Sequence, residues 1–172
     1  VYAVRFVGPT AYVVTFKQVD PLFTLDLADP ARPRVVGELE LPGYSAYLHP
    51  IGGDLLLGIG QDVSREGRPV GTQLSLFDVS DLRHPTRLAH ATLGQGWSEA
   101  EADHHAVLFW PSTGLVVVPF MERAVGYRVG RAHGIELVGR MTHPSGAGGG
   151  AAIRRSVVVG DSVFTVSDAG VA

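Results

Sequence analysis

Leu25-Asp26-Leu27-Ala28-Asp29-Pro30-Ala31-Arg32-Pro33 is echoed 52 residues later by Phe77-Asp78-Val79-Ser80-Asp81-Leu82-Arg83-His84-Pro85. In each copy a run of strand-forming residues ends at Asp, a short turn bounded by Pro follows, and a second such run begins. We expect Asp29 and Asp81 to accept hydrogen bonds from nearby backbone amides, as Asp does in turns. The prolines fix φ and keep the turn out of the strand ladder. The two stretches therefore predict two copies of one strand–turn–strand unit.

Strand-like runs separated by turn residues recur along the whole chain, and no stretch has convincing helical spacing. They form groups at about 1–42, 43–94 and 103–143, with a shorter group at 152–172. Four equivalent second-strand positions are separated by 44, 60 and 48 residues, namely Tyr12, Leu56, Val116 and Phe164. A period near 50 built only from strands is typical of propeller blades.

These observations predict an all-β fold in one domain over residues 1–172. The fold is expected to be a partial β-propeller, with about three four-stranded antiparallel blades and half of a fourth. The second strands include Leu55-Leu56-Leu57 and Val116-Val117-Val118. Continuous rather than alternating apolar residues indicate burial on both faces, between stacked blades. A closed ring takes about 4–8 blades, so we expect the sequence to be a fragment whose ring is completed by missing chain.

The composition excludes several classes of function. The 172 residues are 45% hydrophobic and 18% charged, with a net charge of −3, which is ordinary for a folded domain and gives no electrostatic reason to expect nucleic-acid binding. No cysteine is present, so disulfides, thiolate metal sites and a cysteine nucleophile are excluded. The longest apolar runs, such as residues 115–121, are too short to span a bilayer, and no transmembrane segment is expected.

Several stretches resemble those of a known family. One is Gly43-Tyr44-Ser45-Ala46-Tyr47-Leu48-His49-Pro50, and the others lie at residues 2–8, 15–22, 57–62, 75–81, 103–106 and 153–156. On these residues the chain resembles the bacterial secreted β-propeller domain family, which is distantly related to WD-repeat propellers. The resemblance implies a propeller fold and a secreted or cell-surface location, and it supplies no catalytic residues. The glycine-rich segment 146–150 and residues 130–134 depart from the family pattern.

Asp103-His104-His105 is the strongest candidate for a metal or ligand site, because His and carboxylate side chains suit Zn²⁺ and similar ions. Residues 104–110 are expected to form a first strand, on which His104 and His105 would point to opposite faces and could not easily share an ion. Asp103 and His105 would share a face, and His49 of a neighbouring blade would join them at the central channel. The alternative is a His–Asp hydrogen bond that orders the inner strand.

Arg154-Arg155 is the second candidate. It opens the first strand of the last group, so we expect one guanidinium to face the channel and one to pack within the sheet. An Arg there would bind a carboxylate or phosphate in bidentate fashion, and the alternative is a salt bridge to an acidic residue of a neighbouring blade. Arg5 occupies a comparable place in an early strand and has the same two interpretations.

Other motifs predict no site. Residues 61–67 alternate side-chain oxygens but lack the acidic and glycine positions of a calcium loop, so a solvated loop is expected. The segment 146–150 lacks the Gly-Lys-Ser/Thr ending of a phosphate loop, and no Gly-x-Ser-x-Gly elbow surrounds Ser98. An aromatic recognition surface is the other interpretation of Trp97, Trp110, Tyr44 and Tyr47, but aromatics near strand ends more often pack between blades, and we expect packing here.

The function predicted from these observations is a non-catalytic, extracytoplasmic module that binds a protein or a cell-envelope glycan, or that acts as a scaffold. Its loops on a rigid frame are where recognition normally occurs. No cofactor is expected. The alternative is a metal-dependent hydrolase or lyase with His49, Asp103 and His105 in the channel, assisted by Arg154 or Arg155.

Overall fold

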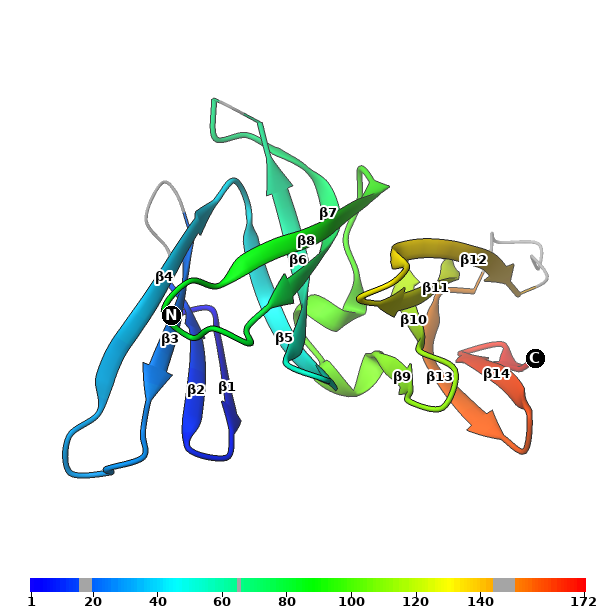
Figure 1. Ribbon diagram of the computed structural model, residues 1–172. Coiled ribbons are helices and arrows are strands. Elements are labelled where there is room, and N and C mark those ends of the chain that lie inside the picture. Colours follow the sequence, from blue (N-terminus) through cyan, green and yellow to red (C-terminus); the bar gives the residue numbers. More distant parts are fainter. Residues whose placement is uncertain (16–19, 65, 144–150) are drawn as a thin grey trace. The chain divides into compact units, whose positions relative to one another are not determined.

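The computed structural model describes residues 1–15, 20–64, 66–143 and 151–172. Within these ranges the chain forms antiparallel β-sheets and two one-turn 3₁₀ helices, and it divides into two compact units, Val1–Gln95 and Gly96–Ala172 (Figure 1). The glycine-rich segment 146–150 lies outside the described residues. None of the helices in the described ranges has the length and apolar character needed to cross a membrane. The all-β prediction is confirmed, whereas the prediction of a single domain stays a prediction.

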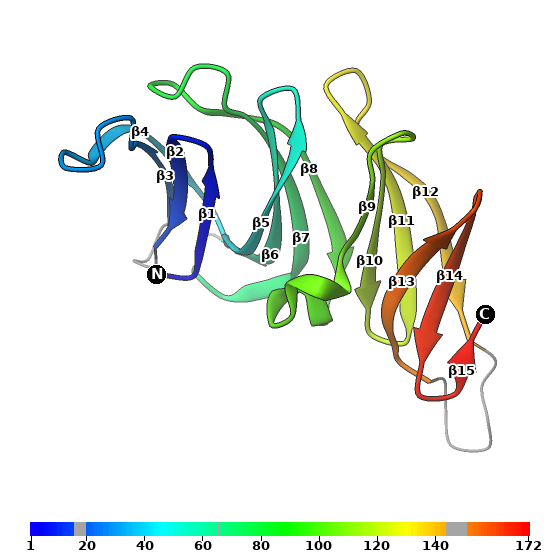
Figure 2. The same ribbon diagram turned by 90° about the horizontal axis from the view of Figure 1, so that it is seen from below.

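The first unit holds two four-stranded sheets, each with its strands in chain order. The first sheet consists of β1 (Ala3–Val7), β2 (Thr10–Val14), β3 (Asp20–Asp26) and β4 (Arg34–Leu41). The second consists of β5 (Tyr44–Gly52), β6 (Leu55–Val63), β7 (Pro69–Asp78) and β8 (Thr86–Gly94). The first strand of one sheet, β1, packs beside the first strand of the other, β5 (Figure 2).

The second unit holds one four-stranded sheet and one with three strands. It begins with the 3₁₀ helices η1 (Glu99–Glu101) and η2 (His104–Ala106), which lead into β9 (Leu108–Trp110), β10 (Leu115–Phe120), β11 (Arg123–Gly130) and β12 (Gly134–Thr142). The last sheet consists of β13 (Ile153–Val159), β14 (Ser162–Ser167) and the short β15 (Gly170–Val171).

The second strands β6 and β10 are buried on both faces, as their continuous apolar runs predict, whereas Phe164 of β14 is 36% exposed. Leu56 and Leu57 of β6 have no exposed surface, and Val116 and Val118 of β10 have none either. In the first unit, residues of both sheets share one buried cluster, formed by Ala3, Tyr12, Val14, Leu22, Leu48, Leu56, Phe77 and Val79. The sheets of this unit are therefore stacked face to face with the core between them.

The two Asp-rich turns form as the repeat predicts, and each contains two side-chain turns in succession. In the first, Asp26 and Asp29 each accept a hydrogen bond from the amide two residues later, at 2.9 and 3.0 Å. In the second, Asp78 and Asp81 do the same at 3.0 and 2.8 Å. The equivalent geometry of the two turns confirms that they are copies of one unit.

The second of these turns also packs onto the first sheet. The buried Thr24 hydroxyl of β3 donates a hydrogen bond to the backbone carbonyl of Leu82. Gly37 of β4 also lies against this turn. A Cβ atom added at Gly37 would collide with the backbone oxygen of Leu82 and would lie 3.0 Å from the backbone oxygen of Arg83. Because backbone atoms cannot rotate away, this position requires the smallest residue.

In the described residues, a β-bulge lies between the third and fourth strands of each four-stranded sheet. The register shifts after Thr24 in the β3–β4 pair, after Leu76 in β7–β8 and after Gly126 in β11–β12. Bulges increase the local twist of a strand pair. The position of these bulges in the third–fourth strand pair is a repeat that the residue types alone do not indicate.

Two expectations about local structure are wrong. The segment 61–67, expected to be a loop throughout, begins as strand, because β6 continues to Val63 and ladder pairing with β7 continues through polar residues such as Gln61 and Thr72. Conversely, residues 104–106 form a 3₁₀ turn instead of strand. At 61–63 the pairing of backbone groups outweighs side-chain polarity, whereas at 104–106 the polar side chain of Asp103 caps the turn.

We predict that Gly37→Ala lowers the free energy of unfolding by about 1–3 kcal/mol, the usual cost of overpacking, because the methyl group would push against the Leu82 carbonyl. Urea denaturation measures this loss. Gly139→Ala is the matched control, since Gly139 also lies on an outer strand and a Cβ there meets nothing within 4 Å. Equal stability of the two variants would contradict the packing of the turn on β4.

Candidate functional site

Neighbouring inner strands of the first unit bring three polar side chains together. Arg5 of β1 crosses to β5, where its Nε donates a hydrogen bond to the Leu48 carbonyl at 2.8 Å and its Nη2 donates to Tyr47 Oη at 2.9 Å. The guanidinium carbon lies 5.3 Å from the centre of the Tyr47 ring, within cation–π range. Arg5 therefore joins the two sheets through both its charge and its hydrogen bonds.

Tyr47 and His49 lie on the same face of β5 because they are two residues apart on a strand. Tyr47 Oη is 2.7 Å from His49 Nδ1. A guanidinium only donates hydrogen bonds, so the Tyr47 oxygen accepts from Arg5. We expect the Tyr47 proton to point to His49 Nδ1, which requires a neutral imidazole with its proton on Nε2.

The electrostatics of the cluster agree with this assignment. Burial lowers the pKa of His49 below its ordinary value of 6.5, and the charge of Arg5 lowers it further. Burial raises the pKa of Tyr47, although the charge and the hydrogen bond of Arg5 act in the opposite direction. Arg5 is consequently the one charged member of the cluster at neutral pH.

No carboxylate balances that charge within the described part of the chain. Arg5 is half-buried, and no Asp or Glu oxygen in those residues lies within 4.0 Å of its nitrogens. Its hydrogen bonds use Nε and Nη2 and leave Nη1 as a further donor. Removing a cation partly from water is unfavourable unless an anion pairs with it, so the cluster is suited to bind an anionic group.

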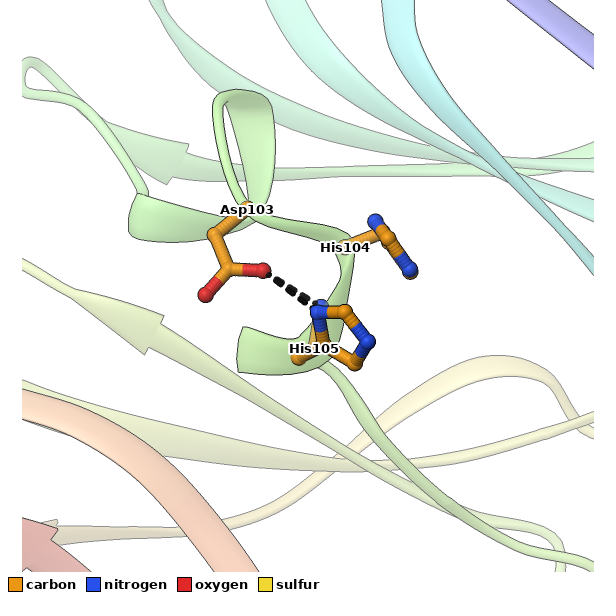
Figure 3. Close-up of side chains that lie close together, drawn as sticks. All are labelled: Asp103, His104 and His105. Atoms are coloured by element: carbon orange, nitrogen blue, oxygen red, sulfur yellow. Dashed lines mark hydrogen bonds and ion pairs between the residues drawn. The ribbon is translucent and has the colours of Figure 1, made fainter.

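The second unit contains the other candidate residues, at the turn before β9. Asp103 is the N-cap of η2, and its Oδ1 accepts from the His105 amide at 2.9 Å and lies 3.0 Å from His105 Nδ1. The ring centres of His104 and His105 are 3.8 Å apart. Figure 3 shows the three side chains on this turn, with the bond between Asp103 and His105 dashed.

The expected strand geometry for this turn is wrong. On a strand, His104 and His105 would lie on opposite faces, whereas on the 3₁₀ turn their rings are in contact. The cause is helix capping: Asp103 caps η2, and Ser98 with Glu101 forms a capping box on η1, so local hydrogen bonds favour turns here. The expected hydrogen bond between Asp103 and His105 is present, but it closes the turn and orders no strand.

Arg154 and Arg155 both pair with carboxylates. Arg154 forms a bidentate pair with Asp168 of its own sheet at 3.1 and 2.9 Å, and Arg155 donates to Asp103 Oδ2 at 2.9 Å. Their side chains are 54% and 53% exposed, so the expectation that one of them packs within the sheet is wrong. The bulge after Ile153 is the reason, since it breaks the alternation of side chains at this point.

These contacts shift the titration of the acids. The amide and ring of His105, and more weakly the charge of Arg155, lower the pKa of Asp103. The hydrogen bonds and charge of Arg154 lower the pKa of Asp168. Exposed ion pairs of this kind add little to stability because water screens them, so their main effect is to hold the side chains in place.

The predicted metal trio is divided between the two units. His49 belongs to the first unit, whereas Asp103 and His105 belong to the second. A site shared by the three residues, and the hydrolase or lyase activity built on it, stays a prediction.

Tyr47 is a member of the first cluster for which the sequence favoured packing between blades over recognition. The spacing Tyr47-x-His49 on a predicted strand was the available signal, because it places both polar tips on one face. His143 was also missed: it is 6% exposed, with Nδ1 2.7 Å from Ser167 Oγ and Nε2 2.8 Å from Thr165 Oγ1. Both ring nitrogens are thus used within the protein, so His143 has a structural role.

We predict that Tyr47→Phe raises the pKa of His49 toward 6.5, because the variant loses the hydroxyl that donates to the neutral Nδ1. The loss of the bond should also lower the free energy of unfolding by about 1 kcal/mol. An NMR titration of the His49 ring carbon resonances measures the pKa. Tyr44→Phe is the control, since the Tyr44 ring stacks on Tyr2 away from His49, and an unchanged His49 pKa in Tyr47→Phe would refute the assigned proton order.

Acidification should destabilise the protein through His49. Its pKa is lowered in the folded state, so below about pH 6.5 the unfolded chain binds a proton that the folded chain does not, and stability falls as the pH decreases toward the folded pKa. Urea unfolding at pH 7.5 and pH 5.5 measures the difference, which His49→Asn should reduce. The exposed His133→Asn serves as the control, and an undiminished difference in His49→Asn would contradict the prediction.

Comparison with known proteins places this architecture in a family. An uncharacterised protein of Methanocaldococcus jannaschii is 38% identical over 167 residues, which are 97% of this chain and 25% of that protein. An uncharacterised protein of Archaeoglobus fulgidus is 41% identical over 138 residues, which are 80% of this chain and 21% of that protein. The chain therefore spans a quarter or less of the length of these relatives.

The β-propeller domain family matches residues 1–172, the whole chain. This match, together with the antiparallel sheets, confirms the predicted class of a partial β-propeller. Both relatives are archaeal, so the bacterial and secreted parts of the resemblance receive no support from them. The chain belongs to the β-propeller domain family.

Proposed function

We propose that this chain is a non-catalytic binding module that holds an acidic side chain of a protein partner at the Arg5–Tyr47–His49 cluster. The observation that carries the proposal is the charge of Arg5, which is half-buried and has no carboxylate within 4.0 Å in the described residues. A carboxylate from a partner would supply that charge and accept a bond from Nη1. Paired, charge-assisted hydrogen bonds of this type are among the strongest in proteins.

The residue types of the cluster favour a protein as the partner. Arg and Tyr are enriched among the residues that dominate the energy of protein interfaces. Tyr47 and Leu48 already hold the guanidinium in one orientation through two hydrogen bonds, so little side-chain freedom would be lost on binding. His49 adds no second positive charge at neutral pH, which leaves a site for a single acid group.

The place of the cluster in the fold supports the same role. β1 and β5 are the first strands of their blades, and propeller blades are arranged around a central channel. A group held there is positioned by rigid strands on both sides. Recognition residues on such a frame keep their geometry before the partner arrives.

The completed ring and its location are further parts of the proposal. The relatives are far longer than this chain, which covers 25% and 21% of their length, and this supports completion of the ring by further strands. An extracytoplasmic location rests on the resemblance to secreted propellers, and immunodetection in separated cell fractions tests it.

A hexaglutamate peptide is the probe for the binding proposal. We expect the peptide to cause saturable NMR shifts of the Tyr47 and His49 resonances and to bind at least tenfold more weakly to Arg5→Gln. We expect intermediate affinity for Arg5→Lys, because lysine keeps the positive charge but lacks the paired donors of the guanidinium. Arg32→Gln is the matched control, because Arg32 is 84% exposed and pairs locally with Asp29. Backbone spectra of each variant confirm that it is folded.

Three outcomes would count against the proposal. Equal peptide affinity in the wild type and Arg5→Gln would show that the cluster does not bind the acid. Equal losses in Arg32→Gln and Arg5→Gln would indicate general charge attraction. Preferential binding of an oligogalacturonate of the same charge would replace the protein partner with an acidic glycan.

A further inference from the structure

We propose that the turn formed by Asp103, His104 and His105 binds one divalent transition-metal ion, of which Zn²⁺ is the model, through the imidazoles of His104 and His105. The site lies within the second unit and is independent of the Arg5 cluster. It also differs from the metal trio expected from the sequence, because it uses His104 where that trio used His49.

The first argument is the proximity of the donor atoms. The two imidazole rings lie 3.8 Å apart between centres, and one donor atom from each of the three residues falls within 4.8 Å of the others. Nitrogen ligands of Zn²⁺ lie about 2.0–2.1 Å from the metal, which places two of them about 3.3 Å apart in a tetrahedral site. The His105 side chain is 64% exposed, so a small rotation of its ring brings the donors together without disturbing the core.

The second argument is the orientation of His105. Its Nδ1 faces Asp103 Oδ1 at 3.0 Å, and a carboxylate oxygen only accepts, so Nδ1 carries the proton and Nε2 has the lone pair. Histidines that bind metals commonly donate their other ring N–H to a carboxylate, which fixes the tautomer and raises the basicity of the ligand. The Asp103–His105 pair is thus already arranged as ligand and orienting group.

The third argument is that Asp103 is itself held in place. Its Oδ1 also accepts from the His105 amide at 2.9 Å, and its Oδ2 accepts from Arg155 at 2.9 Å. The guanidinium of Arg155 pairs with this carboxylate, so its positive charge is largely balanced before a cation arrives. Arg155 is therefore a positioning residue for Asp103, and the exposed turn leaves room for water to complete the coordination of the metal.

Titration of the whole chain with zinc chloride alone tests the proposal. We expect calorimetry to show one ion per chain, and His104→Ala and His105→Ala each to weaken binding at least tenfold. His133→Ala is the matched control, because His133 is also exposed, at 52% of its side chain, and sits in a turn of the same unit. Backbone NMR spectra establish that the variants are folded, since a loss of fold would otherwise imitate a loss of binding.

Asp103→Asn separates the orienting role from a merely structural one. We expect it to lower zinc affinity by about 10–100-fold, the usual effect of removing such a partner. It should also change the tautomer of His105, which long-range ¹⁵N NMR reports in the absence of metal. The proposal is overturned if zinc binding does not saturate, if only one of the two histidines matters, if His133→Ala loses as much affinity, or if Asp103→Asn leaves both affinity and tautomer unchanged.

Discussion

Burial of the second strands between stacked sheets is the interaction on which the rest of this structure depends. Leu56 and Leu57 alternate in direction along β6, yet neither has exposed surface, which is attainable only if both faces of the sheet are covered. Complete burial of a leucine side chain contributes about 1.5–3 kcal/mol, so several such residues in a row supply a large share of the stability of each sheet. A four-stranded sheet of this kind is unstable alone, and the repeat exists because each copy covers its neighbour.

The second constraint is close backbone contact where one repeat meets the next. The turn after β7 is shaped by its own residues, through the carboxylates of Asp78 and Asp81. It then packs on the first sheet through Thr24 and Gly37. In this second copy the same local motif thus forms the turn and fixes how it packs on the neighbouring sheet.

The polar clusters follow from this frame. Stacked sheets bring first strands side by side, and Arg5 bridges from β1 to Leu48 and Tyr47 on β5. In the second unit, capping by Asp103 holds two histidine rings together on a turn of three residues. The first cluster joins residues more than forty positions apart in the chain, and the second is entirely local. They are therefore suited to different ligands, an acid group and a metal ion respectively.

The sequence by itself determined the all-β class, the grouping of the strands, the buried second strands and the Asp turns. Each of these depends on a pattern within a few residues. A run of leucines indicates a buried strand, and an Asp can accept a hydrogen bond from the amide two residues later. Only the tertiary structure decided the contacts of Arg5 with Tyr47 and of Arg155 with Asp103, since they join separate strands whose register is not encoded locally. It also decided that His104 and His105 lie on a turn. The Asp103 carboxylate accepts a hydrogen bond from the His105 amide, which would otherwise be available for strand pairing. Which of the two forms depends on the residues that pack around this segment.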